Sequence, residues 1–130
     1  MVKKLNYATL SPGGSIIYKH LFGDSYNIFK KEIDGNLGVI QLGQLYIWYD
    51  DGFLFNENPH PTLVIKRDPS PQITDWDTVL CGTVLFASHG TKGNKIGLTQ
   101  EARMILARFQ KALMGNKEVF VYVNYSEAAV

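Results

Sequence analysis

The segment 37–57, LGVIQLGQLYIWYDDGFLFNE, constrains the fold most, because turn signals separate short apolar runs within it. Glycine-containing turns at 42–44 and 51–52 divide it into three runs, which predicts three short strands of an antiparallel meander. In the middle run, QLYIWYD, both alternating sets of side chains are apolar or aromatic. We therefore expect a central strand, with one face under a helix and the other face covered or binding something.

Periodicity and turn residues predict the other elements. These are a hairpin over about 5–21, a short helix in 23–36, a strand or helical turn at 62–67, a strand over 78–88 that Gly82 interrupts, a helix over 98–115 and a last strand over 117–125. Thr99 is a natural cap for the second helix, and its buried stripe is predicted at Ala102, Ile105, Leu106, Phe109 and Leu113. The last strand is alternatively an arm that pairs with another chain.

These elements predict an α+β fold. We expect a twisted, mostly antiparallel sheet with two helices, of which the longer C-terminal helix packs on the sheet. A length of 130 residues indicates one domain, 1–130. The aromatic residues of 46–55 and the strand 117–125 exceed what such a small fold covers easily, so we expect a homo-oligomer, at least a dimer.

Composition excludes several classes of protein. The hydrophobic content of 45% is sufficient for a core, and a net charge of +1 argues against a dedicated duplex-DNA binder. The single cysteine, Cys81, excludes an internal disulfide and is interpreted as a buried thiol. No apolar stretch has the length of a signal peptide core or a membrane helix, so we expect a cytoplasmic protein without a membrane partner.

The loop 89–97, HGTKGNKIG, follows the predicted strand 78–88 and precedes a helix. Such an arrangement binds anions at the helix N-terminus, and Lys92, Asn94 and Lys95 are candidate ligand-binding residues there. Its glycine spacing matches neither the dinucleotide-binding fingerprint nor the Walker A pattern. The alternative is a connecting loop without a ligand.

Other chemistry is sparse. The three histidines show no metal-ligand spacing, and no nucleophile elbow or catalytic triad is recognisable, so we expect neither an enzyme nor a metal or cofactor. Asp75 and Asp77 flank a tryptophan and are interpreted as turn or cap residues. Arg103 and Arg108 lie five positions apart on the predicted helix, about 140° around its axis, so only one of them is expected to reach a given site.

Three stretches in this order resemble a family of small phage and mobile-element domains, over roughly residues 25–110. They are IFKKEIDGNLGVIQLGQLYIWYDDGFLFNENPHPTL, VLCGTVLFAS and GLTQEA. The layout is also similar to that of the phage anti-Thoeris sponge proteins. That resemblance implies capture of cyclic ADP-ribose signals of bacterial defence, without chemistry, at sites between subunits.

The resemblance also implies site residues. Phe86 corresponds to an aromatic that stacks on the base, Asn94 to a loop contact, and Arg108 or Arg103 to a phosphate ligand. Lys31, or its neighbour Lys30, stands where the family would offer an arginine. Strand alternation points Phe86 opposite to its neighbours, which is compatible with a site at the sheet end. The alternative is that Phe86 is a core residue.

Two other functions remain open at this point. The protein is alternatively an anti-defence or host-takeover factor that binds and inhibits a host protein directly. A small nucleotide hydrolase, with Asp75, Asp77 or His89 involved, is the third hypothesis.

Overall fold

A computed structural model of the chain describes residues 4–22, 25–33, 37–52, 60–66, 77–89, 95–114 and 117–123. These residues form ten strands and two helices. In chain order they are β1 (Lys4–Leu10), β2 (Ile17–Phe22), α1 (Ser25–Ile33), β3 (Leu37–Leu42), β4 (Leu45–Asp50), β5 (Pro61–Lys66), β6 (Thr78–Cys81), β7 (Val84–His89), β8 (Lys95–Ile96), α2 (Gln100–Leu106), β9 (Gln110–Met114) and β10 (Lys117–Val123).

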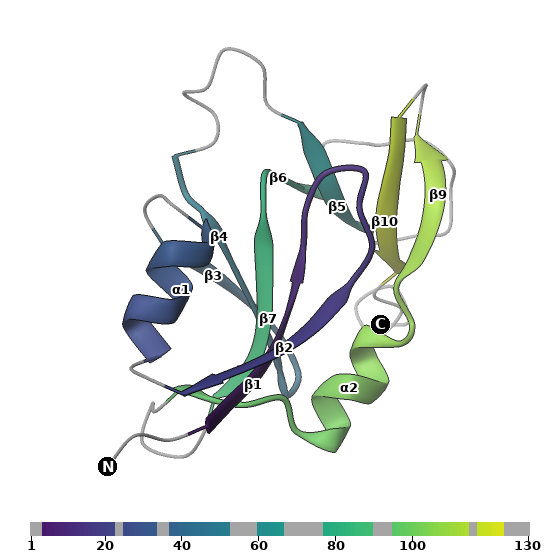
Figure 1. Ribbon diagram of the computed structural model, residues 1–130. Helices are drawn as coiled ribbons and strands as arrows, with labels where there is room; N and C mark the ends of the chain where they lie inside the picture. Colours follow the sequence, from purple (N-terminus) through teal and green to yellow (C-terminus); the bar gives the residue numbers. More distant parts are fainter. Residues whose placement is uncertain are drawn as a thin grey trace.

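The strands form two sheets rather than the single sheet expected from the sequence (Figure 1). The first has the order β2-β1-β7-β4-β3, with β8 paired to β7, and the second has the order β6-β5-β10-β9. The pairing is antiparallel throughout the described residues except between β10 and β5, which are parallel. The α+β class is confirmed.

Gly82 ends one strand and lets the next begin in the other sheet. The sequence predicts one interrupted strand over 78–88, whereas β6 belongs to the second sheet and β7 to the first. Gly82 has a φ of 75°, a conformation that glycine adopts without steric cost. Its position is therefore a junction between sheets rather than a bulge within one.

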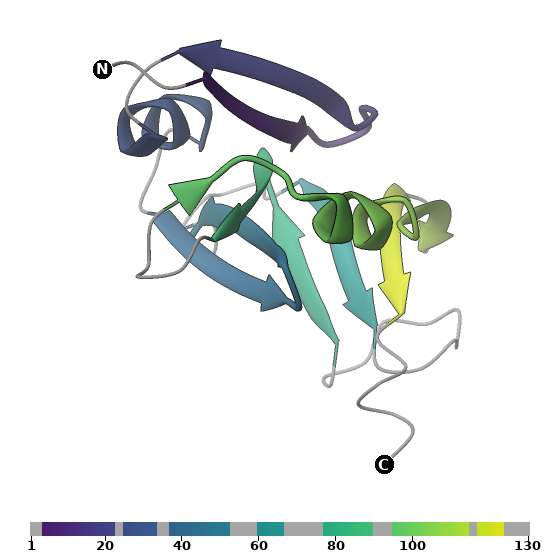
Figure 2. The same cartoon turned by 90° about the horizontal axis from the view of Figure 1, so that it is seen from below.

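The strand β4 has both faces covered, as its sequence predicts. On one face, Leu45 and Ile47 are fully buried in a core cluster that also contains Ala102 and Leu106 of α2. On the other face, Trp48 lies 4.7 Å from Phe29 of α1, measured between ring centroids. The two helices lie on opposite sides of β7 in both views (Figures 1 and 2). Each helix therefore covers a different face of the first sheet. The third run of the predicted meander, at 53–55, lies outside the described residues.

The C-terminal helix is shorter than predicted. It ends at Leu106, and backbone hydrogen bonds from Arg108 to Ile105 and from Phe109 to Leu106 tighten the chain behind it. Phe109 then enters the core, and 110–114 pair with β10 as a strand. At seven residues α2 is shorter than α1, which has nine, so the longer-helix prediction is wrong. Strand pairing here overrides a local helical pattern.

The last strand lies inside its own chain. β10 is hydrogen-bonded between β5 and β9, so its interpretation as an arm that pairs with another chain is wrong. Trp48 is likewise 4% exposed. The expectation of an oligomer depended in part on Trp48 and on the last strand being uncovered. Both are covered within one chain.

Candidate ligand-binding site

The helix α2 is fixed at its start by two hydroxyl side chains. Thr99 is the N-cap, and its Oγ1 accepts a hydrogen bond from the backbone N–H of Ala102 at 3.2 Å. The Thr99 backbone N–H donates to Oγ of Ser88, a fully buried residue of β7, at 3.1 Å. An N-cap that is itself anchored to a central strand sets the position of the following turns.

The two arginines of this region lie on different sides of α2. The guanidinium carbon of Arg103 is 5.5 Å from the centre of the Tyr18 ring on β2, a cation–π contact. Arg108 instead lines a surface cavity. The sequence leaves open which arginine faces a site, and the structure brings Arg108 to the cavity and Arg103 to the β1–β2 hairpin.

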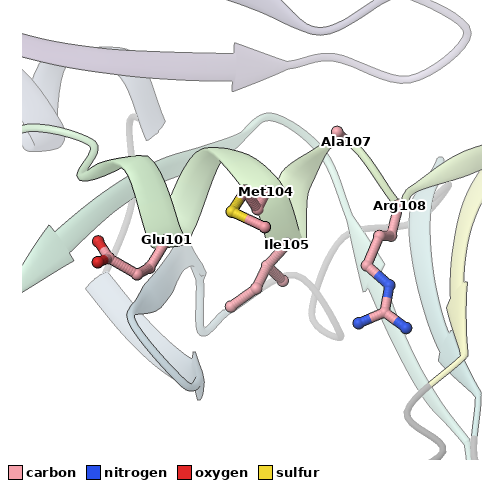
Figure 3. A pocket seen from close by; sticks show the side chains of 5 residues that line it. All are labelled: Glu101, Met104, Ile105, Ala107 and Arg108. Carbon is pink, nitrogen blue, oxygen red and sulfur yellow. The ribbon is translucent and has the colours of Figure 1, made fainter.

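The cavity has a volume of about 560 Å³, and its described lining comes from α2 and the turn behind it. Its lining residues are Glu101, Met104, Ile105, Ala107 and Arg108 (Figure 3). Arg108 and Ile105 project to the same side of the helix (Figure 3). Ile105 also faces the β3–β4 turn, where its Cδ1 lies 3.3 Å from the position that a Cβ on Gly43 would occupy. The turn glycine therefore leaves room for this wall of the cavity.

The lining is mainly apolar, and Glu101 and Arg108, which carry charges of opposite sign, lie at its two ends (Figure 3). Met104 is 64% exposed, so its thioether offers a soft apolar surface to a ligand. The Arg108 guanidinium is a planar donor that matches phosphate or carboxylate oxygens. The Glu101 carboxylate accepts hydrogen bonds from hydroxyl or amino groups.

Phe86 lies in the core. It is fully buried, and its ring meets that of Phe109 edge to face, with 5.6 Å between centroids. The alternation predicted from the sequence is correct, because Leu85 and Ala87 belong to the opposite core cluster. Both faces of β7 are covered, however, so the ring has no exposed surface on which a base can stack.

Lys30 and Lys31 do not lie beside Arg108. Lys31 and Lys30 are exposed on α1, on the other side of β7 from α2 (Figures 1 and 2). Lys95 begins β8, the two-residue strand paired to the end of β7, and its side chain is not described. Asn94 and Lys92 lie outside the described residues.

Of the residues assigned to the hydrolase hypothesis, the structure describes the side chain of Asp77 but not those of Asp75 and His89. Asp77 pairs with Lys66 at 2.6 Å, and both side chains are 1% exposed. Asp75 lies outside the described residues, and only the backbone of His89 is described. Among the residues whose placement is described, no group of three or more His, Cys, Asp or Glu side chains could hold a metal ion.

Sequence reasoning missed four of the five lining residues. Glu101 was interpreted only as negative character at a helix start, Ile105 as part of the buried stripe, and Met104 and Ala107 were not singled out. Of that stripe, Ala102, Leu106 and Phe109 are buried, Ile105 is partly buried, and Leu113 is 70% exposed on β9. The signal was the spacing of Glu101, Met104, Ile105 and Arg108, which is that of one helical face.

The chain was compared with protein families, curated proteins and solved structures. No protein-family model, curated protein or solved structure matches the chain. None of the helices in the described ranges is long and apolar enough to cross a bilayer.

Proposed function

We propose that this protein binds a small phosphate-bearing nucleotide in the α2 cavity and sequesters it without chemistry. The observation that carries the proposal is the position of Arg108, a guanidinium beside an apolar wall in a cavity of about 560 Å³. From the sequence resemblance, the ligand class is a cyclic ADP-ribose-type defence signal. The protein then acts as a phage anti-defence factor in the cytoplasm of the host cell.

The cavity supplies one contact for each part of such a ligand. The guanidinium of Arg108 donates two parallel hydrogen bonds to phosphate oxygens. The base lies against Met104 and Ile105, with the polarisable sulfur near its ring. The Glu101 carboxylate accepts from ribose hydroxyl groups. Met104 thus takes the contact with the base that the resemblance assigns to Phe86.

The test is mass spectrometry of the small molecules released when the protein is denatured after exposure to lysate of cells with an activated defence system. Intact cyclic nucleotide, recovered at a level near one ligand per site, is the expected result. The matched control is the Arg108→Ala variant, which should release much less. Recovery of a cleaved nucleotide favours hydrolysis, and no nucleotide from either protein contradicts the proposal.

A second candidate function is direct binding of a host protein. The observation that favours it is the exposure of large apolar side chains on α2 and β2, with Met104 at 64%, Ile17 at 55% and Tyr18 at 53%. Exposed apolar groups of this kind are typical of protein interfaces. Capture of one host protein that is lost in a Tyr18→Ala variant, without nucleotide release, would support this function over the first.

A further inference from the structure

Within the described part of the chain, the strand β3 is a sheet edge without a protecting charge or proline. It is the last strand of the first sheet and is hydrogen-bonded to β4 on one side (Figure 1). Its sequence, LGVIQL, contains no charged residue and no proline. Val39, near its centre, is 50% exposed. Natural proteins avoid such edges, because a row of unpaired backbone groups beside apolar side chains is a template for another strand.

The other sheet edges in the described part of the chain carry protection that β3 lacks. β2 contains Lys19, which pairs with Glu32 at 2.8 Å. β9 contains Lys111, which pairs with Glu118 at 3.2 Å. β6 has only four residues. Lysine on an edge strand and short edge strands are the usual devices against edge-to-edge pairing. β3 is six residues long and has neither.

The hairpin geometry determines which backbone groups of β3 face outward. Gly43 and Gln44 form a two-residue turn, with a φ of 58° at Gly43, and Leu42 is paired with Leu45 across it. The residues that flank a two-residue turn form a hydrogen-bonded pair, and such pairs alternate along an antiparallel ladder. Leu42, Ile40 and Gly38 therefore bond to β4. The N–H and C=O groups of Leu37, Val39 and Gln41 point away from it.

We infer that β3 pairs with β3 of a second copy of this chain, antiparallel and centred on Val39. The outward groups at 37, 39 and 41 are symmetric about Val39, so a two-fold axis there matches every donor with an acceptor. Leu37 then lies opposite Gln41 of the second copy, and the two Val39 side chains lie opposite each other. The pairing joins the first sheets of two protomers into one continuous sheet.

Two properties favour a second copy over an unrelated strand. β3 is uncharged, so pairing between two copies of β3 brings no like charges together. Pairing between two copies of β2, or of β9, would bring lysine side chains close to each other. Val39 is also on the same face as Leu37, which packs against the core cluster under α1. Two-fold pairing buries Val39 against an identical apolar side chain, and the interface needs no other partner to be complete. This inference does not depend on the proposed ligand.

The first test is the molecular mass by light scattering over a concentration series. Wild type should form dimers, Val39→Lys should raise the dimer dissociation constant about tenfold or more because two like charges then lie opposite each other, and Val39→Thr should remain dimeric. Val39→Thr keeps the branched shape without a charge and is the matched control. Thermal unfolding of each variant checks that the monomer is folded.

The second test uses register-specific crosslinking and does not depend on mass. Residues opposite each other in a hydrogen-bonded antiparallel pair have Cα atoms about 5.5 Å apart, within the range of a disulfide. Oxidised Val39→Cys should therefore run as a covalent dimer, whereas Leu37→Cys should not, because its counterpart is Gln41. A wild type that is monomeric at every concentration, or a dimer that persists in Val39→Lys, overturns the inference. Equal crosslinking of both cysteine variants overturns the register.

Discussion

Lys66 and Asp77 form an ion pair with 2.6 Å between Nζ and Oδ2, and both side chains are 1% exposed. Lys66 is the last residue of β5, and Asp77 immediately precedes β6. The ladder pairs Ile65 with Thr78, so the two charges continue its register by one step. A buried charge without its partner is costly, because its lost hydration is not replaced.

We predict that Lys66→Met lowers the free energy of unfolding by about 3–5 kcal/mol, because it removes the cation that lies 2.6 Å from the buried Asp77 carboxylate. The double variant Lys66→Met/Asp77→Leu should recover most of this loss. The matched control is Lys111→Met, which breaks the exposed pair with Glu118 and should cost no more than about 1 kcal/mol. Chemical denaturation measures all three. A loss for Lys66→Met as small as that for Lys111→Met would contradict the prediction.

Arg108→Ala should weaken binding of a cyclic ADP-ribose-type nucleotide by about tenfold or more, since about 1.4 kcal/mol corresponds to a factor of ten. Arg108→Lys should recover little of the affinity, because an ammonium group cannot reproduce the two-pronged contact. Calorimetric titration measures both variants.

The matched control for Arg108 is Arg103→Ala, a change on the helix that precedes Arg108, which removes a contact to Tyr18 but not to the cavity. Its affinity should equal that of wild type. Equal losses for the two arginines would show that the cavity is not the binding site.

Phe86→Ala should lower the free energy of unfolding by about 3–5 kcal/mol, because it removes a fully buried ring from the core. The affinity of the molecules that remain folded should be unchanged. A milder variant, Phe86→Leu, allows the affinity to be titrated in folded protein. A loss of affinity in Phe86→Leu without a change in melting temperature would indicate that Phe86 contacts the ligand.

Tyr7→Phe should raise the free energy of unfolding, by up to about 1 kcal/mol. The Tyr7 hydroxyl is buried and has no hydrogen-bond partner among the residues that the structure describes. A buried donor without a partner has lost its hydrogen bonds to water without gaining one in the protein. Phenylalanine removes the hydroxyl while keeping the ring. Thermal unfolding at neutral pH measures the change. A clear decrease would mean that the hydroxyl is hydrogen-bonded in solution.

Stability should fall as the pH rises above about 10, the usual pKa of tyrosine. Burial, and then the nearby Glu32 carboxylate, raise the pKa of Tyr7. Burial, and then Asp51, raise the pKa of Tyr49. Each phenol therefore ionises at lower pH in the unfolded chain than in the folded protein. The stability that this difference provides is full below the unfolded pKa and is lost as the pH rises through the folded value.

Chemical denaturation at a series of alkaline pH values measures this loss. The slope of stability against pH should be smaller in Tyr7→Phe and in Tyr49→Phe than in wild type. A slope that neither substitution changes would assign the alkaline loss to other groups.

The local pattern of side chains along the sequence determined several structural features of this protein. The alternation in QLYIWYD requires both faces of β4 to be covered, and two core clusters cover them. Thr99 caps α2 as its position before a polar first turn predicts, and Cys81 is buried as its apolar surroundings predict. Such features depend on a few neighbouring side chains, so a short stretch of sequence is sufficient to specify them.

The tertiary structure alone decided where α2 ends, which sheet each strand joins and which arginine lines the cavity. Gln110–Met114 carry a helical pattern, but β10 offers them a row of backbone hydrogen-bond partners, and Phe109 gains a place beside Phe86 and Tyr122. These contacts join residues far apart in the chain, and their free energy exceeds the small differences in local propensity. The same long-range packing buried Phe86 and left Arg108 at the surface.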